Sequence, residues 1–375
     1  MGGAPAWHLD GASRSEAEAG RGDSCRHRSN ADNRKSRAAA RRYVHFLIGA
    51  DRAVYSALNK KRSQKPLGML QPSMVLSNGW VNCFDFERAL ASVSSPHDSP
   101  STHIFFPEKC SLLIAPALRI LSLANQLVLS NREVTLEFAA GEVGTMGYLN
   151  RIGFFDHLLS GVEVLPFRPF RSGARTFRGG NTGVVEIARI DPGYRESSRN
   201  IHNTLAAALV GAYRGDEDRN VLWGATWTIF SELIDNIYSH SATPLDGYAA
   251  LQVYPGAKKA TVTVSDSGYG IMHTLRGSLK TKFPHLVDLS DSQLLLEIFQ
   301  HGGVSRHGPQ NGLGLHGSAQ KAMKFHADLD VRLPNSRVHL KPNVQGYNKL
   351  AYWSDGLPLL WGTHISFDFR LDATH

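Results

Sequence analysis

The segment WTIFSELIDNIYSHS, residues 227–241, decides how the chain is interpreted, because it carries an apolar stripe and a polar stripe together. Leu233 and Ile237 are four positions apart, as on a helix that packs one face against a core. Glu232 and Asn236 have the same spacing, so a carboxylate and a carboxamide project from another face of that helix. The pair is therefore a candidate binding or catalytic site.

Two strands are predicted directly after this helix. The runs GYAALQVY (247–254) and ATVTVS (260–265) flank the turn PGAKK, which indicates a hairpin. The second strand leads into SDSGYGI, so Asp266 is expected at a strand end. Gly268 and Gly270 would let the backbone turn sharply and approach a planar ligand closely.

A glycine-rich segment follows the next predicted helix, which covers Gln293 to Gln300. It reads GGVSRHGPQNGLGLHGSAQKA (302–322), and Gly312, Gly314 and Gly317 open a further helix. Glycine-rich backbone at a helix N-terminus offers amide donors and a favourable dipole to phosphate. No predicted βαβ strand abuts the segment and no Gly-Lys-Ser/Thr follows it, so a Rossmann or P-loop interpretation is poor.

The helix, the DSGYG turn, the glycine segment and a final WGTHISFDF (361–369) follow one another in this order. This succession resembles the N, G1 and G2 boxes and the closing strand of the GHKL ATPases, the family of gyrase, Hsp90, histidine kinases and MutL. The resemblance implies an ATP-binding domain over residues 195–375, folded as a two-layer α/β sandwich of the Bergerat type.

The resemblance also implies a role for individual side chains. Asp266 would accept a hydrogen bond from the adenine amino group, directly or through a water shared with Thr363. Asn236 would hold Mg²⁺ through its amide oxygen, which is a hard ligand suited to that ion. Glu232 would orient or deprotonate the water that attacks ATP.

Backbone groups complete the site that the resemblance implies. The phosphates would meet amides near Gly312, Leu313, Gly314 and Leu315, and the adenine would lie near Gly268, Gly270 and Ile271. Residues 271–310 would form a mobile lid, in which Ser305 and Arg306 are candidate contacts of the γ-phosphate.

A smaller α/β domain is predicted over residues 95–192, which makes the whole chain α/β. Its expected elements are strands at 103–106, 134–138 and 162–165, a helix at 112–129, and a helix whose apolar face carries Tyr148, Ile152, Phe155 and Leu159. The phrase GTMGYLNRIGFFDHL (144–158) resembles STAS domains. An unrelated α/β module is the alternative.

The excess of positive charge is confined to the N-terminus. The chain has 41 Lys and Arg and 33 Asp and Glu; residues 1–65 hold 14 and 6 of these, so the rest holds 27 of each sign. The first forty residues have almost no large apolar side chains, which predicts disorder there. We therefore expect residues 1–70 to be a disordered basic tail, either able to bind nucleic acid or preceding the true start of translation. The segment FRPFRSGARTFRGG (167–180) is interpreted as a linker, with an anion contact as the alternative.

The three cysteines, Cys25, Cys83 and Cys110, are far apart and form no CxxC pair, which favours a reducing compartment and a cytoplasmic protein. The most apolar stretch, 110–130, is interrupted by polar residues, so no membrane association is expected. No zinc or disulfide framework is indicated.

Several functions remain open at this stage. A slow ATPase that acts as an ATP-driven conformational switch on an unidentified protein partner, with homodimerisation by analogy, is the leading hypothesis. The Glu-x-x-x-Asn-x-x-x-His pattern from Glu232 also resembles anti-sigma serine kinases, while His202 is the near candidate for a histidine kinase phosphoacceptor. The non-enzymatic alternative is an interaction module that holds ATP without hydrolysing it.

Overall fold

The first described residues of the chain form a small parallel sheet. The computed structural model describes residues 73–93, 95–180, 182–215, 217–240, 243, 245–301, 314–343, 346–347 and 352–372. The sheet has the order β1-β3-β5-β6 and contains β1 (Ser73–Val75), β3 (Ser101–Phe106), β5 (Glu133–Phe138) and β6 (Val162–Leu165). A second parallel pair joins β2 (Gly79–Val81) to β4 (Cys110–Leu112). The basic tail predicted over residues 1–70 lies outside the described residues.

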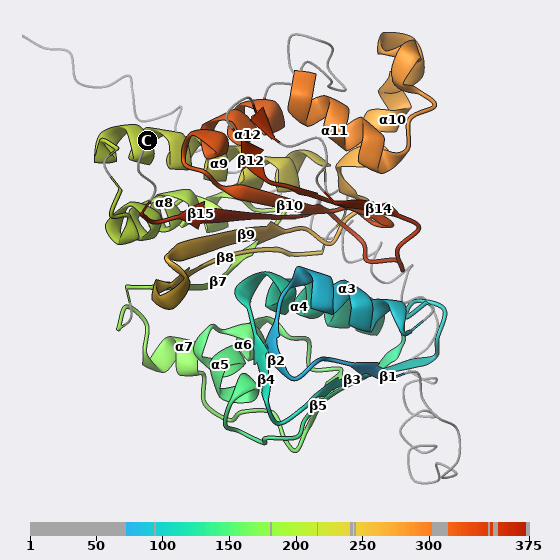
Figure 1. The fold of residues 1–375 in the computed structure, drawn as a ribbon. Helices are drawn as coiled ribbons and strands as arrows, with labels where there is room; N and C mark the ends of the chain where they lie inside the picture. The colour runs from blue at the N-terminus through green and yellow to red at the C-terminus, as the bar shows by residue number, and fades with distance from the viewer. Residues whose placement is uncertain are drawn as a thin grey trace, which may run out of the picture. The chain divides into compact units, whose positions relative to one another are not determined.

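Two longer helices accompany this sheet, α3 (Cys83–Ala91) and α4 (Ile114–Leu129). Asn82 caps α3, because its side chain accepts hydrogen bonds from two amides of the first turn while Asp85 reaches back to the cap. α4 is buried along most of its length, including its polar residues Arg119, Ser122, Asn125 and Gln126. A helix of that kind must be covered on several sides, which explains why it lies between two sheets (Figure 1).

The single helix predicted to carry Tyr148, Ile152, Phe155 and Leu159 is wrong. The structure has two short helices, α5 (Thr145–Arg151) and α6 (Phe154–His157), and Leu159 lies beyond both. Gly153 separates them with φ of 85°, a left-handed conformation that ends the first helix. Ile152 and Phe155 are still buried, so the apolar spacing indicated burial correctly but not an unbroken helix.

The second half of the chain builds a seven-stranded antiparallel sheet of order β14-β11-β10-β15-β9-β8-β7. Its strands are β7 (Val184–Ile190), β8 (Gly247–Tyr254), β9 (Lys259–Ser265), β10 (Asp328–Arg332), β11 (Ser336–Leu340), β14 (Trp353–Asp355) and β15 (His364–Arg370). β7 comes from residues that precede 195, so the larger sheet takes its edge strand from the range 95–192. A short pair joins β12 (Pro342–Asn343) to β13 (Gly346–Tyr347).

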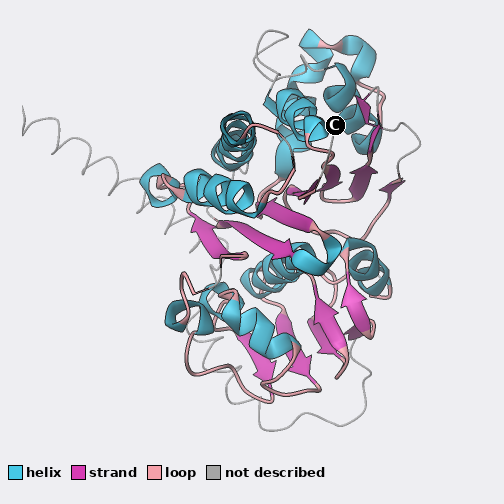
Figure 2. Ribbon diagram, turned by 60° about the vertical axis from the view of Figure 1, so that its left-hand side comes forward, coloured by secondary structure: helices cyan, strands magenta, loops and turns pink. Residues whose placement is uncertain are grey.

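The helices of the second half are α8 (Ile201–Ala212), α9 (Arg219–His240), α10 (Gly270–Lys282), α11 (Asp291–His301) and α12 (Gly314–Lys324). A one-turn helix, α7 (Gly173–Thr176), lies in the arginine-rich segment before β7. Figure 1 places α8, α9 and α12 along one face of the large sheet, and Figure 2 shows the helices and strands from a second direction. The α/β class predicted from the sequence is thus confirmed, with parallel and antiparallel sheets together.

Both faces of the large sheet are buried. Along β8, Ala249 and Leu251 join the core under α8, α9 and α12, whereas Tyr248 and Ala250 join the core that contains α4. The alternation follows from the two-residue repeat of a strand. Residues 70–375 form one compact unit for this reason.

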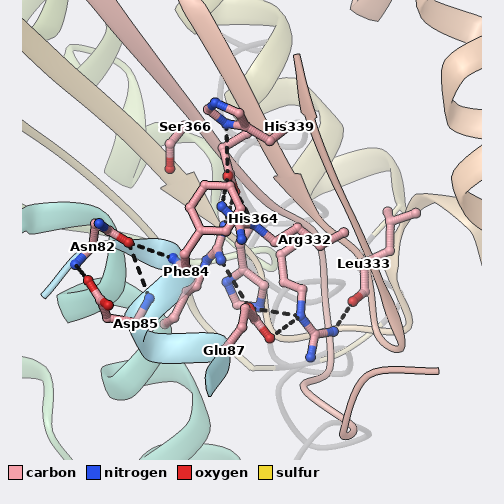
Figure 3. Close-up of polar contacts among 12 residues, drawn as sticks. Asn82, Phe84, Asp85, Glu87, Arg332, Leu333, His339, His364 and Ser366 are labelled. Carbon is pink, nitrogen blue, oxygen red and sulfur yellow. Dashed lines mark hydrogen bonds and ion pairs between the residues drawn. The ribbon is translucent and has the colours of Figure 1, made fainter. Parts of the chain in front are cut away.

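The face toward α3 and α4 carries a buried cluster of charges (Figure 3). Glu87 on α3 accepts hydrogen bonds from Arg119 on α4 at 3.0 Å and from Arg332 on β10 at 3.1 Å. Asp330 on β10 pairs with Arg119 and Arg337, which hold the pKa of its carboxyl well below the usual range. Buried charges are tolerated only when they are paired in this way.

None of the helices in the described ranges is both long and apolar enough to cross a lipid bilayer.

Candidate functional site

Four of the predicted site residues meet at one end of the large sheet. α9 supplies Asn236, the end of β9 supplies Asp266, the start of α10 supplies Ile271, and the segment before β15 supplies Thr363. These four side chains line a single cavity of about 20 Å³. Its remaining walls are apolar and come from Leu233, Ile237, Val264 and Ile365.

The apolar stripe of α9 is placed as its spacing predicts, but Asn236 does not lie on a separate face, since it lines the cavity together with Leu233 and Ile237. Leu233 and Ile237 are buried in the core over the sheet. Asn236 lies on the same side toward the cavity, and its Nδ2 atom is buried without a hydrogen-bond partner among the described residues. An unpaired buried amide costs about 1–3 kcal/mol, so this donor points to a ligand or a water that the site would hold.

Asp266 is the polar centre of the cavity. Its Oδ1 accepts a hydrogen bond from the Gly268 amide at 2.8 Å, and its Oδ2 accepts one from the Thr363 amide at 2.9 Å. Burial nevertheless raises the pKa of this carboxyl to about 6, although the hydrogen bonds from Gly268 and Thr363 oppose the shift. The group is therefore an ionised acceptor at neutral pH, held by two backbone donors.

The segment around Thr363 crosses directly over Asp266. Gly362 has φ of 101° and lies so close that a Cβ atom would overlap the backbone carbonyl of Asp266. Thr363 Oγ1 accepts a hydrogen bond from the Ile271 amide at 3.0 Å, which ties the start of α10 to the same segment. Gly270, the first residue of α10, would also crowd this segment if it carried a Cβ.

Glu232 lies beside the N-terminus of α12, one turn along α9 from Asn236. A Cβ atom on Gly314 would overlap the Glu232 carboxylate, so this carboxylate would have to move away from α12 if residue 314 carried a side chain. Leu315 is buried in the core and anchors the first turn of α12. The structure thus brings Glu232 to the first residue of the helix predicted to face phosphate.

Some predicted contacts cannot be placed. Gly312, Leu313, Ser305 and Arg306 lie outside the described residues, and the described part of the expected lid consists of α10, α11 and the residues that connect them. Within the described ranges, no group of three or more His, Cys, Asp and Glu side chains is arranged to hold a metal ion. A magnesium site would therefore depend on Asn236 together with phosphate oxygens and waters.

The cavity is small compared with the ligand that the resemblance implies. A volume of about 20 Å³ accommodates one water molecule, whereas a purine needs several times this space. The polar groups in its lining come from Asn236, Asp266 and Thr363, and the space between the walls does not admit a purine. Ile271 in the first turn of α10 borders the cavity, and Leu275 and Leu279 further along this helix are buried in the core.

A larger groove lies away from these residues. It has a volume of about 1800 Å³ and runs along β7 between α8 and α7. Most of its charged side chains are already paired, as in Arg199 with Glu196 and Lys258 with Asp372. None of the predicted site residues lines it, and its size alone assigns it no chemistry.

Sequence reasoning missed the residues that position Thr363. Gly362 is signalled by its place in WGTHI, because a glycine before a strand marks a special backbone position. Gln126 and Trp361 gave no local signal, since their contact joins residues 235 positions apart.

His202, the candidate phosphoacceptor, lies on α8 with its ring 5.0 Å from that of Trp227, and burial lowers its pKa.

No family model, curated protein or solved structure matches this chain when it is compared with known proteins. Function must therefore be argued from the geometry of the site and the sequence motifs.

Proposed function

We propose that this protein binds Mg-ATP at the cavity between α9, α10 and the end of β9, and hydrolyses it slowly to drive a conformational switch. The observation that carries the proposal is the convergence of Asn236, Asp266, Ile271 and Thr363 from four separate segments on one cavity. In the sequence, these residues are connected only by the order of the GHKL-like motifs in which they occur.

Each residue has a role in the proposed site. Asp266 would accept the adenine amino group, with Thr363 beside it, and Asn236 would contribute its amide oxygen to Mg²⁺. Glu232 would orient or deprotonate water near the first turn of α12, whose amides and dipole favour phosphate. Bound Mg²⁺ would neutralise phosphate charge during hydrolysis.

The described fold is compatible with the two-layer Bergerat sandwich that the motifs imply. Support comes from the helix layer of α8, α9 and α12, which packs on one face of an antiparallel sheet. The last strand along the chain, β15, lies in the middle of this sheet. In this proposal ATP would displace α10, and the displaced helix would alter the surface offered to a protein partner or to a second copy of the chain.

The experiment that tests this function follows the fate of γ-labelled ATP given to the purified protein with Mg²⁺, alone and with cell extract. We expect release of free phosphate that disappears in Glu232→Ala. Label transferred to a protein would replace the ATPase with a kinase of the anti-sigma or histidine type. Label that stays in bound ATP would indicate a binding module, and no binding at all would refute the proposal.

A further inference from the structure

The side-chain amide of Gln126, on α4, pairs with both backbone groups of Trp361. Gln126 Nε2 donates a hydrogen bond to the Trp361 carbonyl at 2.9 Å, and the Trp361 amide donates one to Gln126 Oε1 at 3.0 Å. Gln126 is 2% exposed, so both bonds are made in a nearly dry environment, where an unmade bond is costly. These two bonds hold the Trp361 backbone in the same way as the paired hydrogen bonds of a neighbouring β-strand would.

Trp361 begins the segment that forms one wall of the cavity. Gly362 follows in a left-handed conformation, and Thr363 then bonds Asp266 with its amide and Ile271 with its hydroxyl. The Trp361 ring also lies edge-on to Tyr269, in the DSGYG turn, with 5.7 Å between ring centroids. A shift of Trp361 would therefore be transmitted over two residues to Asp266, the proposed acceptor of the adenine amino group.

The residues just before Trp361 are anchored on the same side of the sheet. Leu360 is fully buried in the core that contains α4, and its amide donates a hydrogen bond to the Pro334 carbonyl. The carbonyl of Pro358 accepts one from Arg332 Nη2 at 2.6 Å, and Arg332 is in turn paired with Glu87 of α3 (Figure 3). Helices α3 and α4 thus hold residues 358–361 in place, although neither helix belongs to the helix layer that lines the cavity.

We propose that Gln126 is a positioning residue for the nucleotide site, which sets the affinity for the adenine end of ATP by fixing Trp361 and hence Thr363. This inference rests on the proposed ATP-binding function. It differs from a general role in stability, because it predicts an effect on nucleotide binding without one on the chemical step. Gln126 is too far along the chain of contacts to act on the phosphates, which lie toward Glu232 and α12.

The test compares Gln126→Met with the wild-type protein. Methionine has nearly the same size but cannot form either hydrogen bond, and Trp361 would keep the bond of its carbonyl with His364 Nε2 and the contact of its ring with Tyr269. We expect ATP and ADP to bind about tenfold more weakly, the scale of one or two net hydrogen bonds. The rate of hydrolysis at saturating ATP should stay unchanged, so the effect appears in KM and not in kcat.

Asn125→Leu is the matched control. Asn125 precedes Gln126 on α4 and is also buried, but its amide bonds the His157 carbonyl and the Tyr248 hydroxyl, away from the cavity. This variant should lose stability comparably and keep its affinity for ATP. Hydrogen exchange should be faster at the amides of Trp361 and Thr363 in Gln126→Met only.

The outcomes separate this inference from the function on which it rests. Wild-type protein that binds no ATP overturns the proposed function and this role with it. Wild-type protein that binds ATP, with unchanged affinity in Gln126→Met, overturns the positioning role alone. Equal losses of affinity in Gln126→Met and Asn125→Leu also overturn it, because they would trace the effect to stability.

Discussion

The backbone amide of Thr363 donates a hydrogen bond to Asp266 Oδ2 over 2.9 Å, although the two residues are 97 positions apart in the chain. The contact joins the end of β9 to the segment before β15, and the Asp266 amide returns a bond to the Thr363 carbonyl at 3.1 Å. The neighbouring strands β9 and β15 thus continue their backbone pairing one position beyond Ser265 and His364, the last pair of the ladder. Bonds from the Gly268 and Thr363 amides hold the acidic side chain in place at the cavity.

The pKa of Asp266 predicts a pH dependence of nucleotide binding. Because burial raises this pKa to about 6, the carboxyl is ionised at pH 7.5 and becomes protonated as the pH falls through 6. The protonated group has one acceptor oxygen fewer, so ATP affinity should weaken below pH 6, approaching about tenfold per pH unit.

Phosphate groups also titrate near pH 6, so the titration should be repeated with adenosine, which has none. Calorimetry at several pH values checks the prediction, with circular dichroism to confirm that the fold persists. An affinity for adenosine that is constant from pH 7.5 to 5 would contradict the role of Asp266 as acceptor.

Glu232→Ala should abolish hydrolysis while ATP continues to bind. Removal of a general base typically slows a reaction by about 10²- to 10⁴-fold, and Glu232 lies outside the cavity proposed for adenine. Steady-state phosphate release and calorimetry measure the two properties separately.

Asp235→Asn is the control for Glu232, since Asp235 lies on the same helix but forms a largely exposed ion pair with Arg195. It should hydrolyse ATP at the wild-type rate. Equal rates in wild type and Glu232→Ala would remove Glu232 from the chemistry.

Two glycines of α12 make a matched pair. In Gly314→Ala the new methyl group would displace the Glu232 carboxylate, so hydrolysis should fall at least about tenfold. In Gly317→Ala the methyl group meets no atom within 4 Å, and the higher helix propensity of alanine should stabilise the protein by up to about 1 kcal/mol.

Thermal unfolding and phosphate release measured on both α12 variants check this contrast. Wild-type activity in Gly314→Ala would show that the approach of α12 to Glu232 is not needed for turnover.

Asp330→Asn should strongly destabilise the fold. Arg119 and Arg337 would lose their shared carboxylate while remaining buried, and breaking a buried pair typically costs about 3–5 kcal/mol. Asp328→Asn on the same strand is the control: burial raises the pKa of Asp328, so loss of its charge should be neutral or slightly stabilising. Denaturant unfolding distinguishes the two, and a similar midpoint for both variants would refute the account of the charge cluster.

Local sequence signals predicted much of the fold. The strands around Thr135, Val164, Leu251 and Val262 were found from their alternation and β-branched content, and α9 from its apolar spacing. The break at Gly153 was missed, because the apolar repeat continues across it and a single glycine is tolerated in many helices.

The buried polar face of the large sheet could not be predicted. Asp330, Arg332 and Arg337 alternate with apolar residues, a pattern typical of a sheet with one face in water. The structure covers this face with α3 and α4 and neutralises it through Glu87 and Arg119, whose partners are distant in sequence. Only a three-dimensional arrangement shows that such charges are paired.

The candidate site was predictable where its residues lie on regular elements. Glu232, Asn236 and Asp266 follow from a helix and a strand end, and the structure brings the last two to one cavity. The supporting contacts through Gln126 and Trp361 were not predictable, because they depend on how a helix packs against a distant loop.

The most direct test of ATP binding is calorimetry with Mg-ATP on wild type, Asp266→Asn and the control Asp246→Asn. Asp246 precedes β8 at the same end of the sheet, but it pairs with Arg189 at 2.7 Å and does not line the cavity. We predict that wild type and Asp246→Asn bind ATP and that Asp266→Asn does not. ATP affinity in Asp266→Asn equal to that of wild type would contradict the assignment of the site.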